Sequence, residues 1–191
     1  ASSIPSGPIT TLGGTTGNSA PRIAPLSSST IPNAFNLTGD VIPVVAGGLT
    51  ATWAGPFAGS SALSKITVTS TGLTDNTGTL VLSNPSNTYS GLMTVGAGKL
   101  VVNGGFPGAS AAVNTGATLA GSGTIGGNVT VNTGGILAPG ASIGTINTGN
   151  LNLVGSYACE LDLGNPLAAD LVNVTGTVTL DGASSLNASL I

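Results

Sequence analysis

The sequence predicts an all-β fold, a parallel β-solenoid with an irregular Pro-rich N-terminal arm. Short runs of Val, Leu, Ile and Thr alternate with Gly, Asn and Ser turns over residues 61–191, without a long stretch of helical period. In the same region the sequence repeats itself, which is typical of a coil whose turns stack on one another.

The N-terminal part, residues 1–60, holds seven of the eleven prolines. Proline cannot donate to a β-ladder and is tolerated mainly at strand edges, strand starts and bulges. We therefore expect an extended arm with a few irregular strands, of which residues 31–45 and 49–53 are the best candidates. The arm would pack along its own coil or lie on a neighbouring molecule as an assembly segment.

Residues 61–191 form the predicted repeat domain. Runs of β-branched and aliphatic residues between turn residues mark its strands. We expect strands at residues 66–68, 79–82, 92–95, 99–102, 117–120, 128–131, 135–138, 150–153, 157–163, 170–174, 177–180 and 185–190.

The internal repeat is clearest between residues 113–120 (VNTGATLA) and residues 131–138 (VNTGGILA), which are identical at six of eight positions. One such turn cannot bury its own apolar side chains, but turns stacked about 4.8 Å apart give every strand a parallel neighbour. Val113 with Val131, and Leu119 with Leu137, would then form apolar rows inside the coil.

The same offset extends the repeat in both directions. It places Ile125–Gly126 over Ile143–Gly144, and Val95 and Gly98 over Val113 and Gly116. The Asn-Thr-Gly segments at 114–116, 132–134 and 147–149 are expected to stack at one corner, where glycine supplies a positive φ.

Charge is scarce in this chain. Charged residues make up 5% of the sequence, with three Lys or Arg and a net charge of −3, against about 25% charged residues in an ordinary soluble domain. A phosphate backbone needs clustered cations, so we expect no nucleic-acid partner. The apolar stretches are too short for a membrane span. A surface of Thr, Ser, Asn and Gly suits contact with other subunits, and the expected partner is a second copy of the chain.

Histidine is absent and Cys159 is the single cysteine, which excludes the usual triads and zinc sites. We therefore predict no enzyme activity, no catalytic residue, no metal site and no cofactor. Glu160 and Asp162 lie two apart on a predicted strand, on one face, as a solvated pair or, alternatively, a weak Ca²⁺ site. Cys159 is expected to be buried, the alternatives being an intermolecular disulfide or a reactive thiol. Asp170 and Asp181 are expected at turns.

Two further features have a structural and a functional interpretation. The aromatic residues Trp53, Phe57, Tyr89 and Phe106 are expected in packing or an interface, the alternative being a sugar-stacking surface. The Gly-rich segment 121–127 is expected to form stacked turns, because a phosphate-binding loop needs a following helix.

Residues 78–83 (GTLVLS), 87–91 (NTYSG) and 94–100 (TVGAGKL) occur in this order. They resemble the autotransporter-associated β-strand repeat, whose usual form runs G-T-L-x-L-x, N-T-Y-x-G and T-x-x-x-G-x-L. The resemblance covers about residues 78–190. It implies a right-handed parallel β-helix outside the cell, at the surface of a bacterium.

Three functions are considered on this basis. The first is a self-assembling subunit of a cell-surface filament, sheath or coat, in which residues 31–53 add strands to the open end of a neighbour near residues 186–191. The second is the passenger or stalk of an autotransporter-like adhesin that contacts a host or matrix surface, with a membrane barrel encoded after Ile191. The third, which the absence of histidine disfavours, is a carbohydrate-active β-helix enzyme.

Overall fold

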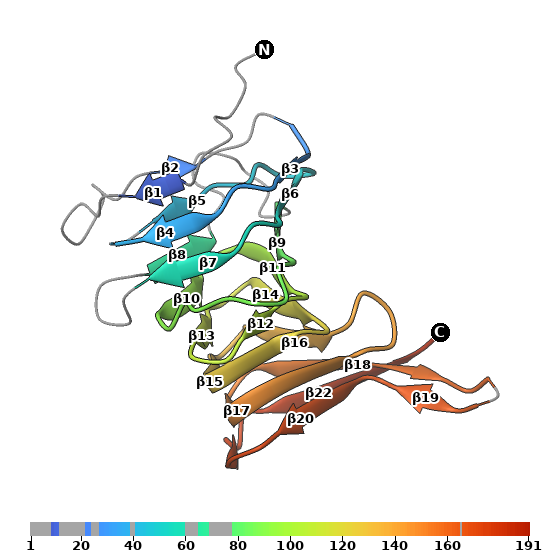
Figure 1. Ribbon diagram of the computed structural model, residues 1–191. Coiled ribbons are helices and arrows are strands. Elements are labelled where there is room, and N and C mark those ends of the chain that lie inside the picture. The colour runs from blue at the N-terminus through green and yellow to red at the C-terminus, as the bar shows by residue number, and fades with distance from the viewer. Residues whose placement is uncertain are drawn as a thin grey trace.

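The computed structural model is an all-β solenoid of about six turns with parallel strands (Figure 1). It describes residues 9–11, 22–23, 27–38, 41–59, 65–68, 78–164 and 166–191. Within these ranges the secondary structure is strands, turns and bends, and the predicted fold class is confirmed.

The described strands form four sheets. The largest has the order β19-β18-β16-β14-β11-β9-β6-β3, with β22 also pairing with β18. The second has the order β20-β17-β15-β13-β10-β8, with β12 on β15 and β21 on β17. Two small sheets, β1-β4-β7 and β2-β5, complete the N-terminal turns. The bounds are β1 (Ile9–Thr11), β2 (Arg22–Ile23), β3 (Ser29–Ile31), β4 (Phe35–Leu37), β5 (Ile42–Pro43), β6 (Thr50–Trp53), β7 (Phe57–Gly59), β8 (Lys65–Val68), β9 (Thr79–Leu82), β10 (Leu92–Val95), β11 (Gly98–Val102), β12 (Gly105–Phe106), β13 (Ser110–Val113), β14 (Ala117–Gly121), β15 (Thr124–Val131), β16 (Ile136–Pro139), β17 (Thr145–Leu153), β18 (Ser156–Asp162), β19 (Ala168–Ala169), β20 (Leu171–Val174), β21 (Val178–Leu180) and β22 (Ser185–Leu190).

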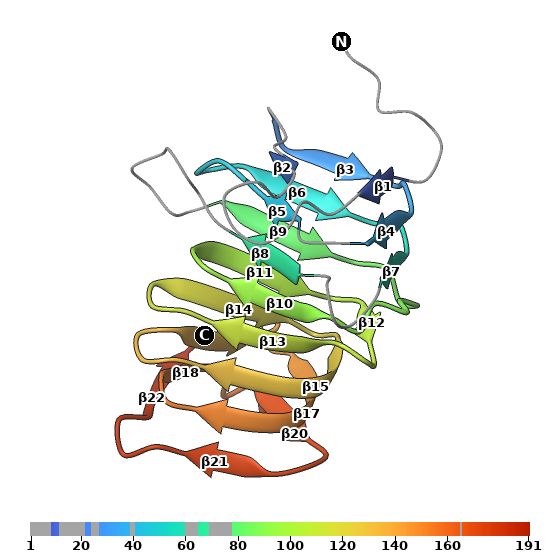
Figure 2. The ribbon, with the colours of Figure 1, turned by 90° about the vertical axis from the view of Figure 1, so that its left-hand side faces the viewer.

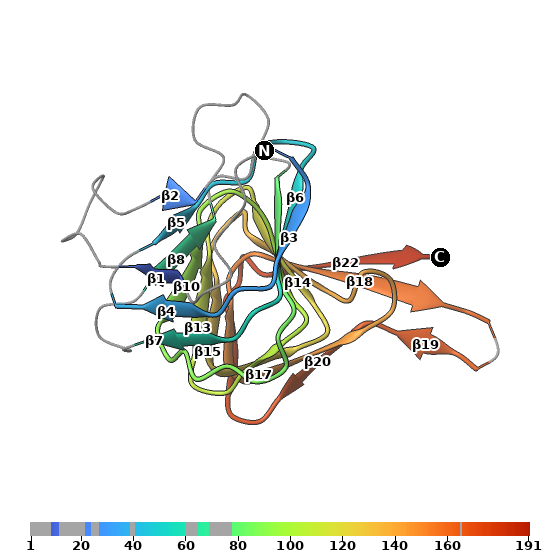
Figure 3. The same cartoon turned by 45° about the horizontal axis from the view of Figure 1, so that its top comes forward.

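Neighbouring strands of a sheet belong to successive turns of the coil, so the layers follow the chain from the N-terminal to the C-terminal end (Figure 2). Among the named strands, each pairing is parallel except that of β18 with β19. With the N-terminal end tilted toward the viewer, β3, β4, β5 and β6 follow one another in a right-handed coil (Figure 3).

The core consists of rows of apolar side chains that repeat from turn to turn. Leu100, Leu119 and Leu137 lie in register on β11, β14 and β16, and all three are fully buried. Lys99 and Thr118 alternate with them and lie on the outer face. Alternation along each strand, combined with stacking across strands, produces one continuous interior.

The predicted rows are confirmed where the turns have equal length. Val95, Val113 and Val131 stack on β10, β13 and β15, and Leu119 stacks on Leu137. Two other predicted pairs are wrong. The first is Gly98 with Gly116, because Gly98 lies in register with Ala117 instead. The sequence offset between paired residues therefore differs between the two large sheets.

The second wrong pair is Ile125 with Ile143, because Ile125 lies opposite Thr148. Residues 140–144 form the connection between β16 and β17 and add residues to that turn. The turn length therefore varies along the coil, from 18 residues between Asn114 and Asn132 to 29 residues between Ser156 and Ser185.

Two of the three Asn-Thr-Gly segments stack at a corner, as predicted. The Asn132 side-chain amide donates to Asn114 Oδ1 at 3.0 Å, and the Thr115 hydroxyl donates to the Thr133 carbonyl at 2.8 Å. Gly116 and Gly134 have φ of 76° and 74°, the left-handed region that favours glycine. The prediction is wrong for residues 147–149, which lie inside β17.

The N-terminal turns are joined to the coil across the expected boundary near residue 60. β3 pairs with β6, and β6 pairs with β9, so the described strands β3 to β7 supply turns of the same solenoid. Phe35 stacks on Trp53 with ring centroids 4.5 Å apart and on Phe57 at 4.9 Å. Whether any part of residues 1–60 also serves assembly stays a prediction.

The aromatic side chains lie inside the coil. Trp53, Phe57, Tyr89 and Phe106 are at most 1% exposed, and Phe57 contacts Phe106 with centroids 6.1 Å apart. The packing interpretation is confirmed for these four residues. They offer no exposed surface on which a sugar could stack.

Candidate functional site

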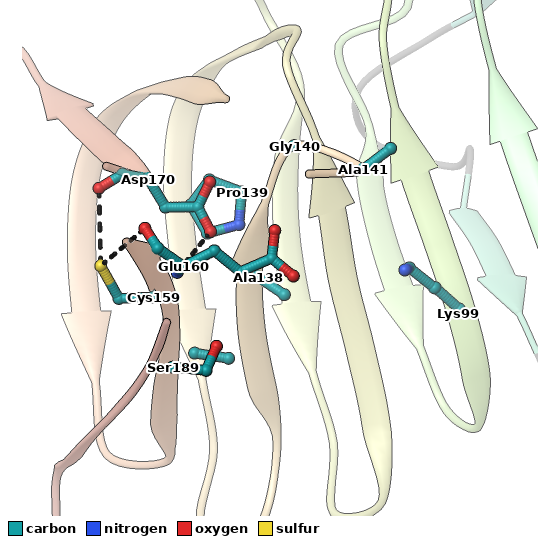
Figure 4. Close-up of a pocket in the computed structure, with 10 residues that line it drawn as sticks. Lys99, Ala138, Pro139, Gly140, Ala141, Cys159, Glu160, Asp170 and Ser189 are labelled. Carbon is teal, nitrogen blue, oxygen red and sulfur yellow. Dashed lines mark hydrogen bonds between the residues drawn. The ribbon is translucent and has the colours of Figure 1, made fainter. Parts of the chain in front are cut away.

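The hollow with the most varied chemistry lies beside the last turns of the largest sheet (Figure 4). Its volume is about 130 Å³. Lys99 lines it from β11, Glu160 and Cys159 from β18, and Asp170 from the segment between β19 and β20. It brings together three side chains, those of Cys159, Glu160 and Asp170, for which the sequence alone predicts separate surroundings.

Asp170 is the central residue of this hollow. Its side chain is 6% exposed, and its two carboxylate oxygens accept separate backbone N–H groups, from Gly144 at 2.9 Å and from Glu160 at 2.9 Å. The Asp170 N–H in turn donates to the Glu160 carbonyl at 2.9 Å. A buried carboxylate is tolerated when N–H donors compensate its lost hydration. Asp170 therefore ties the loop before β17 to β18.

The structure corrects the expected surroundings of Asp170. The sequence predicts a turn at this residue, as it does at Asp181. Asp181 does follow β21 at a turn, where its carboxylate accepts the N–H of Ala183 at 3.1 Å. Asp170 lies instead between β19 and β20 and is buried, because the loop before β17 and strand β18 pack around it.

Tyr157 extends the same cluster. Its hydroxyl donates to the Asp170 carbonyl oxygen at 2.7 Å. Burial, together with the neighbouring Cys159 and Asp170, raises the pKa of Tyr157 well above its ordinary value. The phenol therefore stays protonated and keeps its role as a donor over the physiological range.

Cys159 is buried, as predicted, with 9% of its surface exposed. Its Sγ lies 3.8 Å from the carbonyl oxygens of Glu160 and Asp170. This environment is that of a small packed side chain. The alternative of an intermolecular disulfide would require β18 to open.

Glu160 and Asp162 do not converge on one site. Glu160 lines the hollow of Figure 4, whereas Asp162 lines a different, apolar hollow with Leu163 and Leu167. The Asp162 carboxylate accepts the N–H of Gly164 at 2.8 Å, which shapes its own turn. The two side chains thus have separate structural surroundings, and the geometry gives no support to a shared Ca²⁺ site.

The described residues offer no group of three His, Cys, Asp or Glu side chains that could hold a metal ion. In those same ranges we find no helix with the length and apolarity needed to cross a bilayer. The Asp170 carboxylate connects the loop before β17 to β18 through the N–H groups of Gly144 and Glu160. Sequence reasoning missed it because no cation or turn motif marks Asp170.

The segment that resembles the family repeat also has a clear structural role. Asn87 is 4% exposed, and its Oδ1 accepts the N–H of Phe57 at 2.8 Å. Its Nδ2 donates to the carbonyl oxygens of Asn84 at 2.7 Å and Gly105 at 2.9 Å. Asn87 thereby connects the turn before it and the turn after it. Tyr89, two residues on, is fully buried.

A family model described as the passenger-associated-transport-repeat matches residues 75–102. The matched segment includes β9, β10 and β11 in full. The match confirms the resemblance to the autotransporter-associated repeat. No curated protein and no solved structure matches the chain.

Proposed function

We propose that this chain is a rigid passenger-type segment of a secreted bacterial surface protein, which holds other parts of that protein away from the cell. One observation carries the proposal. The described part of the matched repeat, residues 78–102, pairs in register with the turns on either side, through β6 before it and β14 after it. The repeat is thus part of a longer coil.

Such a coil is suited to act as a spacer. Its interior consists of apolar side chains that stack continuously from turn to turn. Each turn adds about 4.8 Å along the axis of the coil. Each turn packs on its neighbours alone, so length can be added without a new core. The passenger repeat supports a location outside the cell.

The proposal is tested by surface display. The chain, with an N-terminal epitope tag, is fused between a signal peptide and an outer-membrane anchor, and antibody binding to intact cells is measured. We expect the tag to be accessible and to be lost on brief external protease treatment. An inaccessible tag, with the protein retained inside intact cells at normal expression, would refute the proposal.

A matched pair of variants asks whether display depends on the folded coil. Leu119→Asp places a charge in a fully buried row, whereas Thr118→Asp places the same charge on the outer face of the same strand. We expect the Leu119 variant to lose protease resistance of the displayed segment and the Thr118 variant to retain it. Equal protease sensitivity in both variants would contradict a role for the coil.

Self-assembly into a filament, sheath or coat is a second candidate. The scarcity of charge, 5% of the residues, favours it, because a lone soluble domain normally keeps a charged surface. Strand addition by residues 31–53 is disfavoured, because Ile31 and Trp53 are buried in the chain's own coil and β3 and β6 are paired with each other. Negative-stain electron microscopy over a concentration series separates the candidates, since a filament subunit gives fibres and a spacer gives discrete particles.

Contact with a host or matrix surface stays a prediction. That the protein is not an enzyme also stays a prediction. The passenger repeat is a repeat of surface proteins, which supports both. A glycan array with the purified chain tests the first. For the second, a measured polysaccharide-degrading activity that Glu160→Gln abolishes would contradict a purely structural role.

A further inference from the structure

Two opposite charges face each other across the hollow of Figure 4. Lys99 enters it from β11 and Glu160 from β18, and the Lys99 ammonium and the Glu160 carboxylate point toward one another (Figure 4). Both side chains are half-buried, and neither forms an ion pair with any residue that the structure describes. Because burial removes part of the hydration of a charge, the hollow favours a ligand that compensates both charges.

The fold holds the two charges apart. Strands β14 and β16 lie between β11 and β18 in the sheet, which separates the outer two by about 14 Å at about 4.8 Å per strand. The backbone of Glu160 is also fixed, because its N–H donates to Asp170 Oδ2 and its carbonyl oxygen accepts the Asp170 N–H, each at 2.9 Å. The Asp170 carboxylate adds its own charge on this side. The hollow therefore has a positive end at Lys99 and a negative end at Glu160.

The space between these ends is small. Its volume of about 130 Å³ corresponds to about four water molecules at roughly 30 Å³ each. The side chains of Ala138 on β16 and Ala158 on β18 also line it, and they contribute one methyl group each. A ligand with large side chains does not fit a hollow of this volume.

We propose that this hollow binds a short zwitterionic peptide of small residues, with the peptide carboxylate at Lys99 and the peptide ammonium at Glu160. A single α-amino acid carries both charges on one carbon atom. An extended dipeptide spreads over about 7 Å, which suits charges on strands that two others separate. Charge complementarity of this kind determines orientation and specificity more than affinity, so we expect a dissociation constant of about 1 to 10 mM. The inference does not depend on the passenger role.

The test is titration of the isotopically labelled full chain with glycylglycine at constant ionic strength, followed by the NMR shifts of the backbone amides. We expect saturable shifts at residues that line the hollow, Ala138, Gly140 and Glu160. Two blocked analogues serve as ligand controls. N-acetylglycylglycine lacks the ammonium group and glycylglycinamide lacks the carboxylate, and each should bind about 5-fold more weakly or worse.

A matched pair of variants tests the negative end. Glu160→Gln removes the carboxylate that lines the hollow, whereas Asp162→Asn removes one from the same strand that lines a different hollow. We expect Glu160→Gln and Lys99→Gln each to weaken binding about 5-fold or more, and Asp162→Asn to change it less than about 2-fold. Ala138→Leu fills the hollow without changing its charge and should abolish binding. These four positions are partly exposed, so the variants keep the fold, which the amide spectrum checks.

Three results would overturn the proposal. The first is the absence of saturable shifts at these amides up to about 50 mM glycylglycine, well above the expected dissociation constant; this is the result if Lys99 and Glu160 pair directly with each other. The second is equal binding of glycylglycine and either blocked analogue. The third is equal weakening by Glu160→Gln and Asp162→Asn, which would indicate an effect of net charge alone.

Discussion

Replacing Asn87 by Ala tests the role of the buried asparagine in the repeat. The Phe57 N–H would lose its acceptor, and the carbonyl oxygens of Asn84 and Gly105 would each lose one donor. A buried N–H left without a partner costs about 1–3 kcal/mol, and each further hydrogen bond contributes about 1 kcal/mol. Both carbonyl oxygens keep a backbone N–H donor, so neither is left unsatisfied. We therefore expect the free energy of unfolding to fall by about 3 kcal/mol, the lower end of the sum of these contributions.

The assay is urea unfolding followed by circular dichroism, with Asn128→Ala as the matched control. Asn128 accepts the side-chain amide of Asn150 at 2.8 Å on the exposed outer face. Exposed polar groups exchange partners with water, so the control should lose less than about 1 kcal/mol. If Asn87→Ala is no more destabilising than the control, burial of the side-chain hydrogen bonds does not explain why asparagine occupies this position.

Three further changes have expected outcomes in the same assay. Thr148→Val should stabilise the chain by about 1 kcal/mol, because the Thr148 hydroxyl is buried without a hydrogen-bond partner among the described residues; a loss would show a missed partner. Gly55→Ala should destabilise by about 3 kcal/mol, because the new Cβ would overlap the Asn33 carbonyl, whereas Gly182→Ala has open space and should be neutral. Tyr157 has a raised pKa in the folded chain, so its contribution is present below pH 10.0, its ordinary value, and is lost as the pH rises beyond that. Wild type should therefore lose stability above that pH relative to Tyr157→Phe, and parallel curves would refute this.

The sequence predicted most of the coil because its signals are local. The strands at residues 79–82, 92–95 and 185–190 were predicted at their observed bounds, since each is a short run with apolar residues between turn residues. The strand at residues 110–113, β13, was missed. Its sequence, SAAV, has little β propensity, and it is a strand because β10 and β15 lie on either side.

The register was predictable only while the period held. Equal turns place Val113 on Val131, but the connection at residues 140–144 lengthens one turn, and a constant offset then fails at Ile125. Extra residues in a loop change the offset without changing the strand, so no local signal reveals them.

The N-terminal turns were underestimated for a different reason. Prolines lower strand propensity, yet here Pro32 and Pro56 lie in the connections that come after β3 and β6. The stacked rings of Phe35, Trp53 and Phe57 then supply the packing that holds these turns on the coil. The proline content indicated where the strands are interrupted. It could not indicate the ring contacts between turns, because these join residues far apart in sequence.

The central claim is that residues on both sides of position 60 form one parallel coil, and a disulfide tests it most directly. Thr52 and Val81 lie in register on β6 and β9, a spacing that suits a disulfide. In a Cys159→Ser background, Thr52→Cys with Val81→Cys should oxidise rapidly within one molecule, which mass spectrometry detects. Thr52→Cys with Thr118→Cys, which lies several turns away, should not. Failure of the first pair, or linkage of the second, would contradict the continuous coil.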